Sequence, residues 1–337
     1  MDLYACGSNS EGQLGIGHTQ DVGAWTRCTD GERAFPPHGW MVVEIASSAT
    51  GTLALCERGG DRELWTCGRA WPGRDTSAFA RVDTLELGIT GRLVHVAAVW
   101  DCVYVVERVS EGDQIWALGA SNAFGQWGTG PSPAQRAPAW RHRVDVRCMP
   151  DADAGPWRVH AIAGGVRHVL AVLTSAHAHW LVGWGHARHG QLGPLDARVV
   201  HAPQALLCLW RAGAHAPPTH ALALGMAHSV VTVQQHGATR VYLWGSNKHG
   251  QLDMPGWAWD ECGSTAQHAT VPQTVVPACM WRTTLLHVEG RVQAHGADLH
   301  AQTRADGWTC HGTLCAGSEH ALLLDVQGAA MGQVGSG

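Results

Sequence analysis

The sequence predicts an all-β protein whose architecture is a β-propeller. A phrase that reads LYACGSNSEGQL at residues 3–14 returns as VYLWGSNKHGQL at residues 241–252, with seven of the twelve positions identical. A second phrase, made of small residues, a histidine and an apolar run, lies between successive copies of the first. Strand-rich units of roughly fifty to sixty-five residues without a helical period are typical of a propeller rather than of a solenoid or a sandwich.

The first phrase has the chemistry of a strand that runs into a tight turn. Apolar residues such as Leu243 suit a packed strand, and Gly245 ends it. The three asparagines of the chain all fall at the same turn position, where asparagine can bond to the turn backbone and tolerates a positive φ. The residues expected to form this repeated corner are Gly7, Asn9, Asn122, Gly185, Gly245 and Asn247.

The second phrase is expected to form a buried strand with a narrow entry. Its clearest copies are IAGGVRHVLAV, LALGMAHSVVTV and LCAGSEHALLL, which contain His168, His228 and His320. These histidines could be ligands around a central pore, but a histidine that recurs at one repeat position is more often a hydrogen-bonded part of the architecture. We expect that structural role. Each second phrase should also form a hairpin with the first phrase that follows it.

The two phrases divide the chain into six repeats within a single domain, 1–337. The approximate repeats are 1–61, 62–112, 113–178, 179–238, 239–290 and 291–325, followed by a tail at 326–337. The last inner strand, residues 320–324, lacks a partner after it, and the first strand, residues 3–6, lacks one before it. We expect these two strands to pair, which would remove an exposed sheet edge.

Composition and charge narrow the range of functions. The 337 residues are 45% apolar and 15% charged, with a formal net charge of -5. The chain has no excess of positive charge that would favour direct binding of nucleic acid or of an anionic membrane. The start of the chain is strand-like rather than a signal peptide, and the eleven cysteines are scattered singly, as reduced thiols of an intracellular protein would be. The expected location is the cytoplasm, with the nucleus as a second compartment.

Catalytic motifs are missing from the sequence. It contains no GxSxG, HExxH or P-loop pattern, and the GxG at Gly15 and Gly17 lacks the βαβ setting of a dinucleotide site. His186 and His189 lie in a turn, where their spacing does not make a metal site. We therefore expect a protein that is not an enzyme and that has no catalytic residues, metal or cofactor.

The paired phrases WGSNxxGQLG and AGxxHxxxL resemble the RCC1 repeat (regulator of chromosome condensation), and the resemblance covers essentially the whole chain. Propellers of that superfamily usually have seven blades, so seven is the alternative to the six repeats counted. Within the superfamily, the start at the first strand and the irregular inner segments VAAVWDCVYVV and ACMWRTTLL are similar to the fungal alpha-tubulin suppressor branch.

This resemblance implies a non-enzymatic regulatory or adaptor protein. Members of that branch bind a small zinc-ribbon, iron-binding protein, and the pair supports diphthamide synthesis on elongation factor 2 and Elongator-dependent modification of the tRNA wobble uridine. The implied partners are therefore the zinc-ribbon protein and Elongator, and the chain alone would be a monomer. The alternative is a guanine-nucleotide exchange factor or effector for a small GTPase, the best-known activity of the superfamily.

A tryptophan-rich loop is one candidate for partner binding. Trp257 and Trp259 lie beside Asp260 in LDMPGWAWDECGS, outside the repeat phrases. Large aromatic side chains often supply most of the binding energy at protein interfaces. Alternatively, these rings fill space between blades, and the sequence leaves both interpretations open.

Two substituted copies of the second phrase are further candidates. Trp100 and Asp101 stand in one copy, and Trp281 and Arg282 in another, where other copies have small or polar residues. Their side chains are expected to emerge at one propeller face, where they could contact a protein partner.

Overall fold

The structure is a computed structural model that describes residues 2–130, 140–146, 156–193, 195–213, 216–258, 260–261, 266–309, 312–324 and 330–335. This part of the chain consists of β-strands and turns with one short 3₁₀-helix, η2 (Gln302–Ala305). None of its helical segments is long and apolar enough to cross a membrane. The chain forms two compact units, the first made of Met1–Ile162 and His201–Pro203, the second of Ala163–Val200 and Gln204–Ser336.

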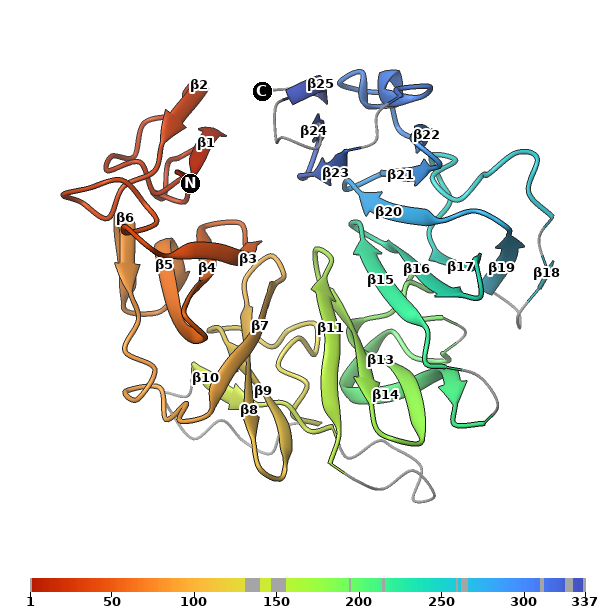
Figure 1. The fold of residues 1–337 in the computed structure, drawn as a ribbon, viewed down its shortest axis with the longest axis horizontal. Helices are drawn as coiled ribbons and strands as arrows, with labels where there is room; N and C mark the ends of the chain where they lie inside the picture. The colour runs from red at the N-terminus through yellow and green to blue at the C-terminus, as the bar shows by residue number, and fades with distance from the viewer. Residues whose placement is uncertain are drawn as a thin grey trace. The chain divides into compact units, whose positions relative to one another are not determined.

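Antiparallel sheets make up the first unit (Figure 1), and consecutive strands along the chain pair with one another. The first sheet contains β1 (Tyr4–Gly7) and β2 (Val22–Arg27). The second contains β3 (Met41–Ser47), β4 (Gly51–Arg58), β5 (Asp61–Trp71) and β6 (Arg74–Arg81), in that order. The third contains β7 (Arg92–Ala98), β8 (Val103–Val109), β9 (Gly112–Leu118) and β10 (Arg141–Arg143).

Four further sheets follow along the chain and lie mostly in the second unit. The first contains β11 (Arg158–Gly164), β12 (His168–Thr174), β13 (Ala178–His186) and β14 (Val199–Arg211). The next contains β15 (Thr219–Leu224), β16 (His228–Gln235), β17 (Ala238–Gly245), β18 (Asp260–Glu261) and β19 (Ala266–Val271). The last two contain β20 (Val275–Cys279), β21 (Thr283–Val288) and β22 (Arg291–Gly296), and β23 (Thr313–Ala316), β24 (His320–Leu324) and β25 (Ala330–Gly335).

Each second phrase forms two strands rather than one. A tight turn divides it, and in the copy at β11 and β12 the N–H of Gly165 donates to the carbonyl of His168 at 2.8 Å. The equivalent bond joins Gly225 to His228 at 3.0 Å. The buried strand that the phrase predicts is the apolar run from the histidine onward, as in β12 and β16, whereas the small residues before the histidine end the preceding strand and enter a turn. The predicted hairpins between a second phrase and the next first phrase are present, as in β12 with β13 and β16 with β17.

Buried apolar residues hold the sheets of each unit together. In the first unit, Leu53 and Leu55 of β4 pack with Val103 and Val105 of β8, and all four side chains are fully buried. In the second unit, Leu285 belongs to a cluster that includes residues of β20 to β24. Burying one such aliphatic side chain stabilises a fold by about 1.5–3 kcal/mol.

The two ends of the chain differ from the expected closure. In the described residues, β24 pairs with β23 on one edge and with β25 on the other, with Leu322 opposite Gln333. The first strand, β1, pairs with β2 instead, with Tyr4 opposite Arg27. The predicted pairing of residues 320–324 with residues 3–6 was wrong, because the segment called a tail contains a strand of its own.

Candidate functional site

The corner turns repeat one set of hydrogen bonds. In four described copies, a side-chain oxygen accepts the backbone N–H five residues later. The pairs are Asn9 with Leu14 (2.9 Å), Asn122 with Trp127 (2.9 Å), Asn247 with Leu252 (2.8 Å) and Asp298 with Thr303 (2.9 Å). These contacts close the turn on itself, as side-chain bonds of Asn and Asp do in tight turns.

A glutamine that sequence reasoning did not select stabilises the same corners. Its Oε1 accepts the N–H two residues earlier in each of five turns. The pairs are Gln13 with Glu11 (2.9 Å), Gln126 with Phe124 (2.8 Å), Gln191 with His189 (2.9 Å), Gln251 with His249 (2.8 Å) and Gln302 with His300 (2.8 Å). The recurring letters GQL and GQW were the available signal for this role.

The corner glycines adopt backbone conformations that favour glycine. Gly7, Gly185 and Gly245 have φ values of 113°, 101° and 106°. A Cβ at Gly185 would also lie 2.6 Å from the carbonyl oxygen of Arg167, so the neighbouring strand leaves no room for a side chain. These positions are part of the scaffold.

The repeated histidines stand at the start of an inner strand. His168 and His228 are fully buried, whereas His320 is exposed. The ring of His168 packs over Gly165, and its Nε2 lies 2.9 Å from the hydroxyl of Ser229. This packing favours a structural role for His168.

Trp100 and Asp101 occupy the turn between β7 and β8 in the first unit. The Trp100 side chain is 43% exposed, and its backbone carbonyl accepts the N–H of Ala49 at 2.9 Å. The carboxylate of Asp101 accepts two contacts from Nε2 of Gln126, at 3.0 and 3.2 Å. An exposed aromatic side chain therefore stands on a turn that a corner glutamine ties down.

Trp281 and Arg282 occupy the corresponding turn between β20 and β21 in the second unit. Both residues are half-buried. The N–H of Trp281 donates to the carbonyl of Ser318 at 2.7 Å, and its carbonyl accepts the N–H of Met226 at 2.8 Å. The backbone of this tryptophan thus links three successive turns of the second unit.

The tryptophan-rich loop is described in part. Trp257 is half-buried and packs against the apolar cluster that contains Val230, Val241 and Leu243. This contact supports the space-filling interpretation for Trp257. Trp259 lies outside the described residues. The backbone of Asp260 belongs to β18 and pairs with His268 of β19.

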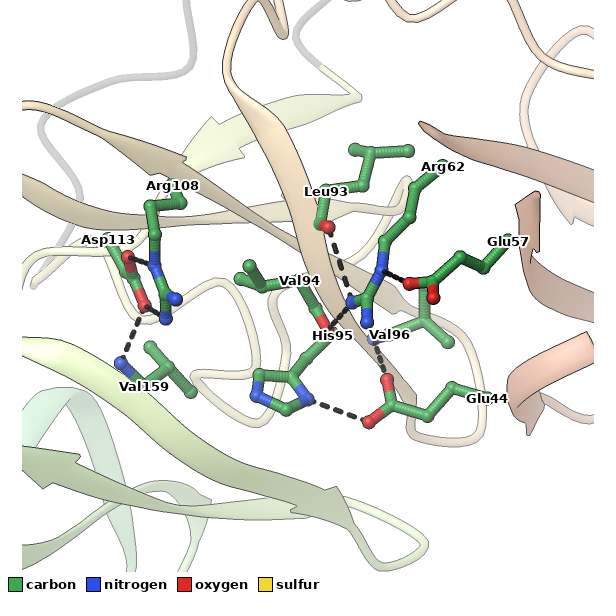
Figure 2. Close-up of polar contacts among 10 residues, drawn as sticks. All are labelled: Glu44, Glu57, Arg62, Leu93, Val94, His95, Val96, Arg108, Asp113 and Val159. Carbon is green, nitrogen blue, oxygen red and sulfur yellow. Dashed lines mark hydrogen bonds and ion pairs between the residues drawn. The ribbon is translucent and has the colours of Figure 1, made fainter. Parts of the chain in front are cut away.

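A group of charged side chains in the first unit, the charged network, was not predicted from the sequence (Figure 2). Oε1 of Glu44, on β3, lies 2.7 Å from Nδ1 of His95, on β7. The other oxygen of Glu44 accepts the N–H of Val96 at 2.7 Å. Glu44 therefore joins two sheets of the unit through both of its oxygens.

Arg62 lies next to this pair and is held from two sides (Figure 2). Its Nε donates to Glu57 at 2.6 Å. Its Nη1 donates to the carbonyls of Leu93 at 3.4 Å and Val94 at 2.9 Å. One guanidinium thus bridges β4 and β7, because Glu57 and the two carbonyls come from different sheets.

Asp113 is the anchor of a second group of polar contacts in the same unit (Figure 2). Its buried carboxylate accepts two hydrogen bonds from Arg108 at 2.9 Å each, one from Nη1 of Arg158 at 2.9 Å and one from the N–H of Val159 at 2.9 Å. Burial raises the pKa of Asp113, but the bonds from Arg108, Arg158 and Val159 outweigh that effect, and the pKa lies below its ordinary value. Asp113 therefore stays ionised and fixes Arg108 in place.

Sequence reasoning missed the network because its members are scattered from residue 44 to residue 159. No spacing brings Glu44, His95 and Arg108 together; only the pairing of strands into neighbouring sheets does so. The sequence feature that could have pointed to these residues is a charged residue inside an otherwise apolar strand, such as Glu44 in MVVEIAS. Among the residues that the structure describes, no group of three or more His, Cys, Asp or Glu side chains could hold a metal ion.

Comparison with known proteins shows similarity to RCC1-repeat proteins. The chain is 28% identical over 289 residues to the secretion-regulating guanine nucleotide exchange factor of Bos taurus, covering 82% of this chain and 53% of that protein. It is 23% identical to an RCC1 repeat-containing protein of Schizosaccharomyces pombe, covering 98% of this chain and 86% of that protein. The chain spans about half the length of the cattle and mouse exchange factors that it matches. No family model matches the sequence.

Two solved structures share the fold. Human WBSCR16 aligns with a TM-score of 0.64 at 14% identity, covering 96% of this chain and 86% of that one. Yeast RCC1 (Prp20), in its complex with Kap60, aligns with a TM-score of 0.58 at 16% identity, covering 94% of this chain and 87% of that one.

The predicted fold class is confirmed: the chain is an all-β protein with an RCC1-like propeller fold. The names of its relatives support the resemblance of the sequence pattern to the RCC1 repeat.

Proposed function

We propose that this chain is a regulatory, protein-binding propeller whose partner is a small GTPase and that it accelerates guanine-nucleotide exchange on that partner. The observation that carries this proposal is the similarity to the cattle secretion-regulating guanine nucleotide exchange factor over 82% of the chain. This similarity supports the exchange factor, which the sequence gives as the alternative, better than the zinc-ribbon adaptor. Yeast RCC1 (Prp20) is bound to Kap60 in its solved structure, which agrees with a propeller that works by binding other proteins.

Such a protein needs no covalent chemistry of its own. A protein that binds the nucleotide-free GTPase more tightly than the nucleotide-bound form must, by linkage, lower the affinity for nucleotide. What the propeller must supply is a rigid contact surface. The turn with Trp100 supplies an exposed aromatic anchor, and Gln126 holds the neighbouring Asp101 in place.

Nucleotide release tests the proposal. A panel of small GTPases loaded with fluorescent GDP is mixed with substoichiometric chain and excess unlabelled nucleotide. We expect faster release from at least one GTPase, with more than one turnover for each chain. Release at the intrinsic rate across the panel, together with no co-elution of any nucleotide-free GTPase, would exclude this function.

Replacing the exposed anchor should weaken exchange. Trp100→Ala removes a ring that is 43% exposed while leaving the backbone bond to Ala49 in place, so the fold should persist. If Trp100 anchors the partner, the loss is about 2 kcal/mol of binding, or roughly thirtyfold in affinity. The matched control is Trp25→Ala, which removes a tryptophan of similar exposure, 50%, from β2 of the same unit. Equal exchange by both variants would remove the Trp100 turn from the interface.

The zinc-ribbon adaptor is the second candidate, and it rests on the segments VAAVWDCVYVV and ACMWRTTLL that resemble the alpha-tubulin suppressor branch. None of the relatives named above has a name that refers to diphthamide, Elongator or tubulin. Size-exclusion chromatography with light scattering, using the zinc-ribbon protein, separates the candidates. A stable one-to-one complex without nucleotide exchange would favour the adaptor, and two separate peaks would exclude it.

A further inference from the structure

A cavity of about 230 Å³ lies in the first unit, and Glu44, Arg62, His95 and Arg108 are among the residues that line it. It is lined by residues of β3, β4, β5, β7 and β8. Three arginines face it, Arg62, Arg92 and Arg108, together with His95 and Glu44.

Two of the three guanidinium groups are fixed before any ligand arrives. Arg62 is held by Glu57 and by the carbonyls of Leu93 and Val94. Arg108 is held through Nε and Nη2 by the buried carboxylate of Asp113. Each guanidinium carries five N–H donors in a rigid fork, so these contacts occupy only part of its capacity. The positions of the remaining donors are set in advance, which lowers the entropic cost of binding an acceptor.

Arg92 is the most exposed of the three arginines. Its side chain is 53% exposed, and its contact with Glu57 is long, at 3.8 Å. Glu57 is already bonded to Arg62 at 2.6 Å. Arg92 can therefore turn toward a ligand without breaking a close ion pair.

Charge at the cavity favours an anion. The lining contains three arginines and one carboxylate, that of Glu44. Both oxygens of Glu44 are engaged, one by His95 and one by the N–H of Val96. Glu57 also contacts Arg62 and Arg92, and Asp113 binds Arg108 together with Arg158. The four arginines exceed the three carboxylates Glu44, Glu57 and Asp113 by one, so the surroundings of the cavity keep one positive charge within a chain whose formal net charge is -5. An acidic ligand would be drawn to this cavity rather than to the surface as a whole.

The apolar part of the lining indicates which anion fits. Val43, which is 40% exposed, also borders the cavity and can pack against methylene groups, while Leu55 and Val94 in the lining are buried. A glutamate or aspartate side chain combines a short apolar stem with a planar carboxylate that matches the guanidinium fork. A free phosphate would leave the apolar part of the lining without a partner.

We propose that this cavity binds the side-chain carboxylate of an acidic segment on a protein partner. The geometry that carries the proposal is the convergence of Arg62, Arg92 and Arg108 on one open cavity that Val43 also borders. The site requires neither a GTPase nor nucleotide exchange, so the two proposals can fail independently.

Fluorescence anisotropy with a labelled hexaglutamate peptide tests the site on the full chain. At low ionic strength we expect saturable binding of hexaglutamate, weaker binding as salt is added, and no binding of the matching hexaglutamine peptide. Arg92→Gln should weaken hexaglutamate binding about tenfold, the effect of losing one charge-assisted contact. Charge reversal in Arg92→Glu should abolish it.

The matched control is Arg81→Gln on β6 of the same unit. Arg81 is 63% exposed and contacts Glu63 at 3.3 Å, so it resembles Arg92 in exposure and pairing but does not line the cavity. Arg81→Gln should change the affinity for hexaglutamate by less than about twofold relative to the unaltered chain. Equal effects of Arg92→Gln and Arg81→Gln, or no hexaglutamate binding by the unaltered chain, would overturn the proposal. Displacement of the peptide by inorganic phosphate at concentrations where glutarate has no effect would overturn the carboxylate assignment.

Discussion

Two buried histidines of the second unit give stability a dependence on pH. Burial lowers the pKa of His168 to about 3, with further lowering from nearby His228 and His186, and burial lowers that of His228 to about 4. In the unfolded chain both imidazoles return to an ordinary pKa near 6.5. Below that pH the unfolded state binds protons that the folded state does not, so protonation favours unfolding.

The free energy of unfolding should therefore be fully retained above about pH 6.5 and fall as the pH drops from there toward about 3. The expected slope is up to about 1.4 kcal/mol per pH unit for each of His168 and His228. Urea denaturation between neutral and mildly acidic pH measures it. A midpoint that does not change across this range would show that the buried histidines do not control stability.

Two substitutions assign the pH effect to individual residues. His168→Gln should reduce the slope by the contribution of one proton, about 1.4 kcal/mol per pH unit, because glutamine has no ionisable group. His177→Gln replaces an exposed histidine in the turn before β13 and should leave the slope as it is in the unaltered chain. A slope that responds equally to both substitutions would contradict the assignment to the buried ring.

At the scale of elements, each corner joins a strand to a turn where two strands come closest. Gly245 ends β17 with φ at 106°, and a Cβ there would meet the carbonyl oxygen of Ala227 and lie 2.7 Å from Cα of His228. Gly245→Ala combines backbone strain with a steric clash, so we expect a loss of about 1–3 kcal/mol in unfolding free energy. Thermal or urea denaturation measures the loss.

Gly213→Ala is the control for the corner substitution. A Cβ at Gly213 would meet nothing within 4 Å, and its φ is not in the left-handed region. Its replacement should change stability by less than about 1 kcal/mol. Equal losses at Gly213 and Gly245 would mean that the corner geometry is not what makes Gly245 necessary.

Sequence reasoning succeeded where a local chemical requirement recurs. The corner needs a glycine, a turn-forming polar residue and an apolar anchor at fixed spacing, so copies such as residues 7–14 and 245–252 are visible in the sequence. The tight turn inside each second phrase was missed, because small residues such as Ala163 and Gly164 suit both a narrow strand and the approach to a turn.

The charged network could not be predicted for a different reason. Its contacts depend on which strands become neighbours across two sheets, and Glu44 has no local feature that identifies His95 as its partner. The candidate tryptophans were chosen by residue type, and residue type does not report exposure. Trp100 is exposed whereas Trp257 packs against an apolar cluster, and only the folded chain distinguishes them.

At the scale of the whole molecule, function depends on surfaces that a repeated scaffold presents. Repeat residues such as Asn9 and Gln191 are buried and serve the scaffold, so they carry no information about the partner. The residues that differ from copy to copy are the informative ones, among them Trp100 and the arginines of the cavity. This division explains why relatives with one fold can have different partners.

The last strand should protect the chain from self-association. Deleting residues 330–337 removes β25 and leaves the edge of β24 without its backbone partner, and unpaired sheet edges pair with other chains. We expect the deleted chain to form larger species than the full chain does at the same concentration, measured by size-exclusion chromatography with light scattering. Deleting only residues 336–337 keeps β25 and should leave the mass unchanged. A monomeric deletion variant with unaltered denaturation would show that β25 does not cover this edge in solution.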